Sequence, residues 1–177
     1  MRRILLSCAL LAVLTAPAVA AARASASGNP GYVVVRKAVG DGGVNGRPVI
    51  TLVVQGFVLG RISQEGQVDV VQLPSVSGQG APQATPGTST KAIRWRVGGH
   101  RFTGKQFSGS NFRFRAMGGL YRLTVRGSGI YLFAGGHGHV TLRGSSRYTR
   151  ADGWYSIDGG HFRSLPERPL SREIGRG

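Results

Sequence analysis

Six arginines alternate with apolar residues along three short stretches of the chain, and their guanidinium groups could bind anions. Residues 93–97 read IRWRV, residues 112–115 read FRFR and residues 121–126 read YRLTVR. Successive side chains of a β-strand point to opposite faces, so we expect the apolar members to face a core and the arginines to face away from it. The arginines concerned are Arg94, Arg96, Arg113, Arg115, Arg122 and Arg126. If the three strands are neighbours, the sequence predicts one contiguous cationic surface.

A surface of this kind would attract a polyanion, such as nucleic acid, a phosphate-bearing wall polymer or anionic lipid headgroups. The composition agrees, because 23 Lys and Arg residues stand against 7 Asp and Glu residues and the formal net charge is +16. The other interpretation is an ordinary solvated face that discourages edge-to-edge strand pairing. Sequence-specific recognition of nucleic acid is not expected, since there is no helix for a major groove and the aromatic residues alternate with the arginines on the opposite face.

Histidines give the chain a candidate metal site. His137 and His139 are two residues apart, so on an extended segment both rings would point the same way, as two metal ligands do. No third ligand is evident, and glycines lie before and between the two histidines. The pattern favours turn-flanking surface histidines, and no metal or cofactor is expected.

Catalytic side chains are sparse. Ser156, Asp158 and His161 lie close in sequence, but they bracket Gly159-Gly160, which is typical of a hairpin turn and not of a catalytic cleft. There is no Gly-x-Ser-x-Gly motif, and the glycine-rich runs look like turns instead of phosphate loops. The sequence therefore predicts a non-enzymatic protein, with a small cell-wall hydrolase as the alternative.

The elements that would position these residues are β-strands. Residues 50–59 and 68–73 are predicted to be the strands of a first unit, apolar and polar residues alternate over 93–97, 112–115 and 121–126, and paired glycines follow several of these runs. The stretches 50–71 and 121–144 can be laid over one another so that Gly56 meets Gly127 and Gly66 meets Gly138. We predict an all-β fold, a sandwich or flattened barrel of short antiparallel strands built from two related units. A short β-solenoid is the alternative.

Three regions flank or interrupt the predicted domain. Residues 1–26 have the two arginines, the apolar run and the small residues of a secretion signal, and Cys8 inside it is the only cysteine. A single β domain is expected over 27–166, with a flexible loop at 74–90 that is rich in Pro, Gly, Ser, Thr and Gln. The polar residues 167–177 are predicted to form a disordered tail.

Residues 112–144, FRFRAMGGLYRLTVRGSGIYLFAGGHGHVTLRG, and 152–166, DGWYSIDGGHFRSLP, resemble segments of small exported β-rich proteins of actinobacteria. The resemblance implies a signal peptide and a β fold, and its structural glycines imply no chemistry.

The expected function is a non-enzymatic exported protein that associates with the cell envelope. Its partner would be an anionic envelope polymer or lipid surface, with no transmembrane span in the mature protein. A structural or assembly module that uses its sheet edges is the other alternative.

Overall fold

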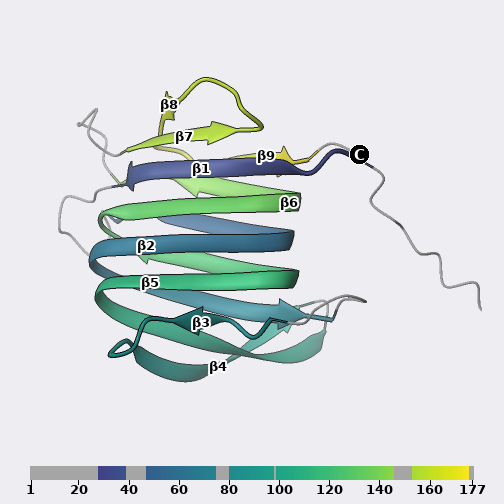
Figure 1. Cartoon of the computed structure of the whole chain (residues 1–177), viewed down its shortest axis with the longest axis vertical. Helices are drawn as coiled ribbons and strands as arrows, with labels where there is room; N and C mark the ends of the chain where they lie inside the picture. Colours follow the sequence, from purple (N-terminus) through teal and green to yellow (C-terminus); the bar gives the residue numbers. More distant parts are fainter. Residues whose placement is uncertain (1–27, 39–46, 75–79, 98, 146–152, 176–177) are drawn as a thin grey trace, which may run out of the picture.

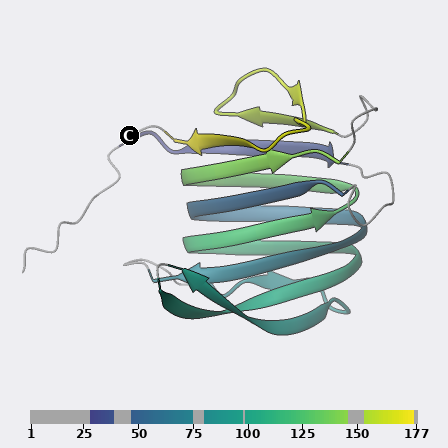
Figure 2. The same cartoon turned by 180° about the vertical axis from the view of Figure 1, so that it is seen from behind.

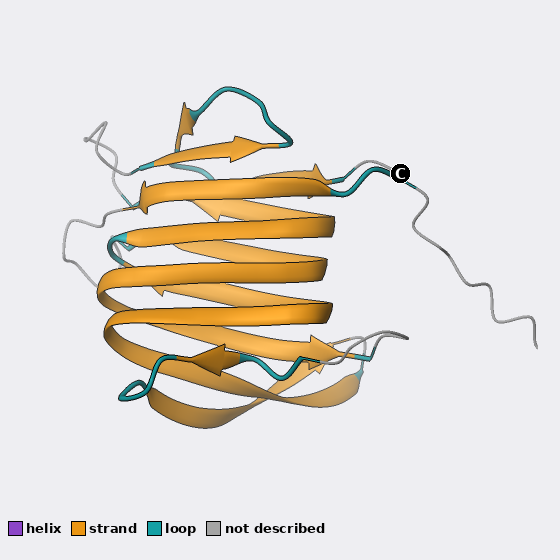
Figure 3. Cartoon of the chain, viewed as in Figure 1, coloured by secondary structure: helices purple, strands orange, loops and turns teal. Residues whose placement is uncertain are grey.

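The chain folds as a single antiparallel sheet without helices among the residues described. The computed structural model describes residues 28–38, 47–74, 80–97, 99–145 and 153–175, so the predicted signal at 1–26 lies outside them. Its nine strands, coloured orange in Figure 3, confirm the predicted all-β class. They are β1 (Gly31–Ala38), β2 (Val49–Leu73), β3 (Gln83–Ala84), β4 (Ser89–Val97), β5 (His100–Gly127), β6 (Ile130–Arg143), β7 (Trp154–Ile157), β8 (Arg163–Ser164) and β9 (Leu170–Ile174).

The sheet is open and folds over itself into two layers, which gives the flattened sandwich that the sequence predicts (Figures 1 and 2). The front layer contains, in order of hydrogen bonding, β8, β7, β1, residues 130–135 of β6, 57–62 of β2, 112–117 of β5, and β3. The back layer contains β9, residues 138–143 of β6, 49–55 of β2, 120–127 of β5, 66–73 of β2, 100–109 of β5, and β4.

Glycines mark the line at which three adjacent strands pass between the layers. Gly56 of β2 lies opposite Gly119 of β5 on one side and Gly136 of β6 on the other. The backbone has φ of 155° at Gly56 and 134° at Gly136, which residues other than glycine rarely adopt. A Cβ at Gly56 would also overlap the carbonyl oxygen of Gly135. Glycine therefore allows the three strands to bend this close together. Gly119, Gly56 and Gly136 are together called the glycine line.

The strands are longer than the short strands predicted from the sequence. β2 has 25 residues and β5 has 28, because their glycines bend the strand and do not end its pairing. A second bend occurs on the side of the sandwich opposite the glycine line, where Gly66 pairs with both Gly109 and Gly127. All eight strand pairings of the described residues are antiparallel, whereas the coils of a β-solenoid stack in parallel.

The two predicted units have a common course. Residues 49–73 and 120–143 each run through the back layer, the front layer and the back layer again. The glycines that match in the sequence alignment do not occupy equivalent places in the fold. Gly56 lies on the glycine line, whereas Gly127 lies at the bend on the opposite side of the sandwich.

The core lies between the layers and consists of aliphatic and aromatic side chains from both. Phe112, Phe114, Leu123 and Val125 are buried, as the alternation predicts. Burial of such side chains stabilises a fold by about 1.5–3 kcal/mol each. Among the described residues there is no helix long and apolar enough to cross a membrane.

Two segments that were expected to lack structure contribute strands. Residues 75–79 of the predicted loop lie outside the described residues, but β3 within it pairs with β5, and the Tyr121 hydroxyl donates a hydrogen bond to the Gly80 carbonyl at 2.6 Å. The predicted tail contains β9, which pairs with β6 and completely buries Ile174. The difference has a physical reason: each segment pairs with a strand edge and caps one end of the core, which composition alone does not reveal.

Candidate binding surfaces

The six predicted arginines lie in three pairs on three different surfaces, so the single contiguous surface expected from the sequence does not form. Arg113 and Arg115 lie on the outer face of the front layer, in the part of β5 that pairs with β2 and β3. Arg122 and Arg126 lie on the outer face of the back layer, beyond the glycine line. The third pair, Arg94 and Arg96, lies on β4. The alternation is correct within each strand, but the strands belong to different layers.

Arg126 takes part in a polar network that stabilises the fold. Its Nη1 donates to Asp69 Oδ2 at 2.9 Å, and Asp69 is only 6% exposed. Gln67 Nε2 and Gln106 Nε2 donate to the other carboxylate oxygen at 2.8 and 2.9 Å. A buried carboxylate needs such donors because it has lost its water. The Arg126 guanidinium is therefore already committed to a carboxylate.

The Arg122 guanidinium lies over an aromatic ring. Its Cζ lies 4.8 Å from the ring centroid of Trp95, within the range of a cation–π interaction. Trp95 therefore lies on the same face as Arg122 and is half-buried there, although the sequence predicts that it faces the core. The reason is that β4 is the last strand of the back layer. Its apolar side lies on the outer face of that layer, with Arg122, and not on the side that faces the core between the layers.

The other face of the β4–β5 hairpin is cationic and exposed. Arg94 and Arg96 lie two residues apart on β4, and Arg101 and Lys105 lie four residues apart on β5, all on this face. Three residue pairs of the hairpin follow one another on this face: Arg96 with Arg101, Arg94 with Thr103, and Ala92 with Lys105. These four residues are called the hairpin basic face. No Asp or Glu occurs anywhere between residues 70 and 151, so no carboxylate of this region neutralises it.

Sequence reasoning missed Arg101 and Lys105, although the signal was present. They are the first and fifth residues of RFTGK, residues 101–105, so on a strand both side chains point to the same side. Recognising them requires the hairpin register, which pairs Val97 with His100 and so brings Arg96 and Arg101 together.

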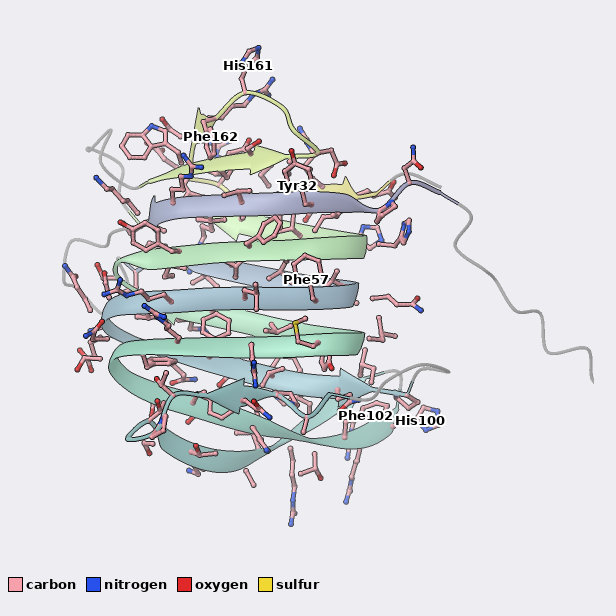
Figure 4. The ribbon with its side chains drawn as sticks, in the orientation of Figure 1. Tyr32, Phe57, His100, Phe102, His161 and Phe162 are labelled. Carbon is pink, nitrogen blue, oxygen red and sulfur yellow. The ribbon has the colours of Figure 1, made fainter. Side chains whose placement is uncertain are left out.

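A second surface, also missed, consists of exposed aromatic and aliphatic side chains on the front layer. Phe133 of β6 makes edge-to-face contacts with Tyr32 of β1 and Phe57 of β2, with centroids 6.0 and 5.3 Å apart. Leu59 lies beside Phe133, and Met117 lies beside Phe57. Figure 4 shows Tyr32 and Phe57 on neighbouring parts of this face. The aromatic face is defined as Tyr32, Phe57, Leu59, Met117, Tyr131, Phe133, Trp154 and Phe162.

Arginines accompany the aromatic face on the same strands. Arg36 lies over the ring of Phe162 with its Cζ 4.4 Å from the centroid. Arg61 lies opposite Arg113, and Arg115 lies opposite Leu59. Their partners are neutral: Arg61 donates to Asn111 Oδ1 at 3.0 Å, and Arg115 donates to Gln83 Oε1 at 3.0 and 2.7 Å. The strand segments of the front layer contain no Asp or Glu.

The candidate metal ligands lie on β6 beyond the glycine line. His139 is exposed and opposite Glu173 of β9, while His137 is half-buried near Gly175. No group of three or more His, Cys, Asp or Glu residues that could hold a metal ion occurs in the described part of the chain.

The residues considered for catalysis have structural partners. The Ser156 hydroxyl donates to the Gly160 carbonyl, and Asp158 Oδ1 accepts a hydrogen bond from the Tyr32 backbone N–H at 2.8 Å. Asp158 and His161 line an open cleft of about 990 Å³ between β7, β8 and β9. Both hydrogen bonds stabilise the hairpin and its attachment to β1.

Comparison of the chain with protein-family models, with curated proteins and with solved structures finds no match. The surfaces described above are therefore the basis for assigning a function. The resemblance to exported actinobacterial proteins stays a prediction.

Proposed function

We propose that this is a non-enzymatic exported protein of the cell envelope that binds an anionic polymer on the hairpin basic face. The observation that carries the proposal is the direct juxtaposition of Arg96 and Arg101 in the β4–β5 register. Like charges opposite each other destabilise a strand pair, and a bound anion between them removes that cost. The arrangement therefore favours a bound state in which phosphate or carboxylate groups lie between the two strands.

The residue types suit such a ligand. Arginine offers a planar fork of donors that matches a carboxylate or phosphate, and three of the four residues of the hairpin basic face are arginines. All four are exposed, so a long polymer reaches them without a change in the fold. Trp95 and Phe102 lie on the other side of these strands, and Phe107, which lies on the same side as Arg101 and Lys105, is buried in the core, so none of these three aromatic rings is exposed on the hairpin basic face. Binding would thus depend on charge and not on base stacking or sequence.

Polymer binding at different salt concentrations tests the proposal. Heparin and double-stranded DNA serve as probe polyanions, and the affinity of the wild-type protein should fall steeply and linearly on a log–log plot against salt. In the double variant Arg96→Ser, Arg101→Ser the slope should decrease by about one for each DNA phosphate that the protein no longer neutralises. Arg172→Ser is the matched control, because Arg172 is an exposed arginine on β9 whose Nη1 donates to the Ser171 carbonyl at 3.1 Å.

Two results would contradict the proposal. One is an unchanged slope in the double variant with an intact fold. The other is wild-type binding that does not respond to salt. Release of the protein from cell walls by salt in fractionated cells would separately test the envelope location.

A further inference from the structure

The aromatic face is unusual for the surface of a soluble domain. Met117 is 46% exposed, Leu59 and Phe133 are 40% exposed, and Tyr32 is 39% exposed. These residues are not scattered, because the register places Tyr32, Gly135, Phe57 and Met117 in one row and Val34, Phe133, Leu59 and Arg115 in the next. Contiguous apolar surface of this kind marks an interaction site.

We propose that the aromatic face docks the protein on an anionic lipid surface, independently of the polymer site on the hairpin. The apolar side chains would enter the boundary between headgroups and acyl chains, and the arginines beside them would contact lipid phosphates. Tyr131 and Trp154 have the amphipathic rings that favour this boundary. Arginine can keep its aliphatic stem in the apolar region while its guanidinium reaches the headgroups.

Charge selects the lipid over a second copy of the chain. Arg36, Arg61, Arg113 and Arg115 all lie on the outer face of the front layer, and its strand segments have no acidic residue. Two copies that met through this face would bring eight arginines together, and the nearest carboxylate that contacts a residue of the face is that of Asp158, beside Tyr32 at its edge. An anionic headgroup layer provides the complementary charge, at roughly fivefold in affinity for each basic residue near the surface.

The polar content of the face selects the lipid over a glycan. Sugar hydroxyls need hydrogen-bond partners when they leave water. Between the aromatic rings, however, the outward positions are occupied by Gly135, Val34, Leu59 and Met117, which have no polar side-chain atom. The backbone groups there are already paired in the sheet. Such a surface favours acyl chains over hydroxylated rings.

Sedimentation with vesicles tests the inference. The exported form of the protein should bind phosphatidylcholine vesicles that contain phosphatidylglycerol. Leu59→Ser with Met117→Ser should reduce the partition coefficient about tenfold or more, since each substitution removes an apolar side chain from the membrane-facing surface. Arg113→Ser with Arg115→Ser should reduce it by about fivefold per arginine and only when phosphatidylglycerol is present. All four side chains are exposed, so these variants should retain the fold.

The control separates this site from the polymer site. Arg96→Ser with Arg101→Ser should weaken heparin binding and leave vesicle binding unchanged, so that either proposal can fail alone. A spectroscopic readout comes from Trp154, because the chain has two tryptophans and Trp95→Phe leaves Trp154 as the single emitter. Its fluorescence should shift to shorter wavelength on anionic vesicles.

Three outcomes would overturn the inference. These are an unchanged partition coefficient in the Leu59, Met117 double variant, no shift in Trp154 emission, and a dimer in vesicle-free solution that the same double variant abolishes. The last outcome would assign the face to a second copy of the chain.

Discussion

Gly56 of β2 lies directly opposite Gly136 of β6 at the line where both strands pass from one layer to the other, and both residues have positive φ. The two backbones are so close that a Cβ on either glycine would overlap a carbonyl oxygen of the other strand. The folding of one sheet into two layers therefore depends on the absence of two side chains.

Substitution at this line should be strongly destabilising. Gly56→Ala or Gly136→Ala should lower the free energy of unfolding by about 2–5 kcal/mol, because backbone strain of about 1–2 kcal/mol adds to a steric overlap of about 1–3 kcal/mol. Urea denaturation measures the change. The control is Gly87→Ala, since Gly87 has φ of 86° but no atom within 4 Å of the added Cβ. It should show the strain alone, and equal losses at all three positions would contradict the steric explanation.

Tyr121 connects the segment before β3 to the core through a hydrogen bond. Its ring is completely buried, and its hydroxyl lies 2.6 Å from the carbonyl oxygens of both Gly80 and Met117. The hydroxyl has one proton that the two carbonyls share, so Tyr121→Phe removes that donor and should lower the free energy of unfolding by about 1–3 kcal/mol. Thermal denaturation at neutral pH measures the loss. A stability equal to that of the wild type would mean that the residues around Gly80 contribute nothing to the fold.

The same tyrosine should make stability depend on pH in alkaline solution. Burial raises the pKa of Tyr121 above its usual 10.0. The folded state therefore holds the phenolic proton more tightly than the unfolded state, and this contribution is complete below pH 10.0 and is lost as the pH rises through the folded pKa. The wild type should lose more stability above that pH than Tyr121→Phe does. Parallel pH profiles would contradict the assignment.

β9 should stabilise the end of the sandwich. Ile174 is completely buried against β6, so Ile174→Ala should cost about 2–5 kcal/mol. Glu173→Ala is the control, because Glu173 is exposed one residue away. Equal stabilities of the two variants would support the disordered tail that the sequence predicts.

Local alternation was enough to predict much of the fold but not the layer to which a strand belongs. Phe112 and Phe114 face the core and Arg113 faces solvent, as expected, because that segment has one apolar and one polar side. Residues 130–134 read IYLFA and are apolar on both sides, so alternation alone cannot show that Tyr131 and Phe133 are the exposed ones.

Pairing between distant segments was the part that could not be predicted. The outer side of β4 could be identified only from its contact with Arg122, which is 27 residues from Trp95 along the chain and beyond a bend between the layers. Glycines were ambiguous for a similar reason, since a glycine can end a strand or bend it. Which one occurs depends on whether the neighbouring strands bend at the same line, as at Gly56 and Gly136.

Arg126 and Arg96 should have opposite roles, although the sequence pattern assigns them to the same anion-binding surface. Arg126 donates to the buried carboxylate of Asp69, whereas Arg96 is exposed opposite Arg101. Arg126→Ser should lower the free energy of unfolding by about 1–3 kcal/mol, because Asp69 loses a charged hydrogen-bond donor. It should leave the salt slope of heparin binding unchanged.

Arg96→Ser should leave stability unchanged or raise it slightly, since it relieves the repulsion from Arg101, and it should flatten the slope. Chemical denaturation and salt titration of the two variants measure both quantities. A flattened slope in Arg126→Ser, at a stability equal to that of the wild type, would show that Arg126 binds the polymer and that its ion pair with Asp69 contributes little.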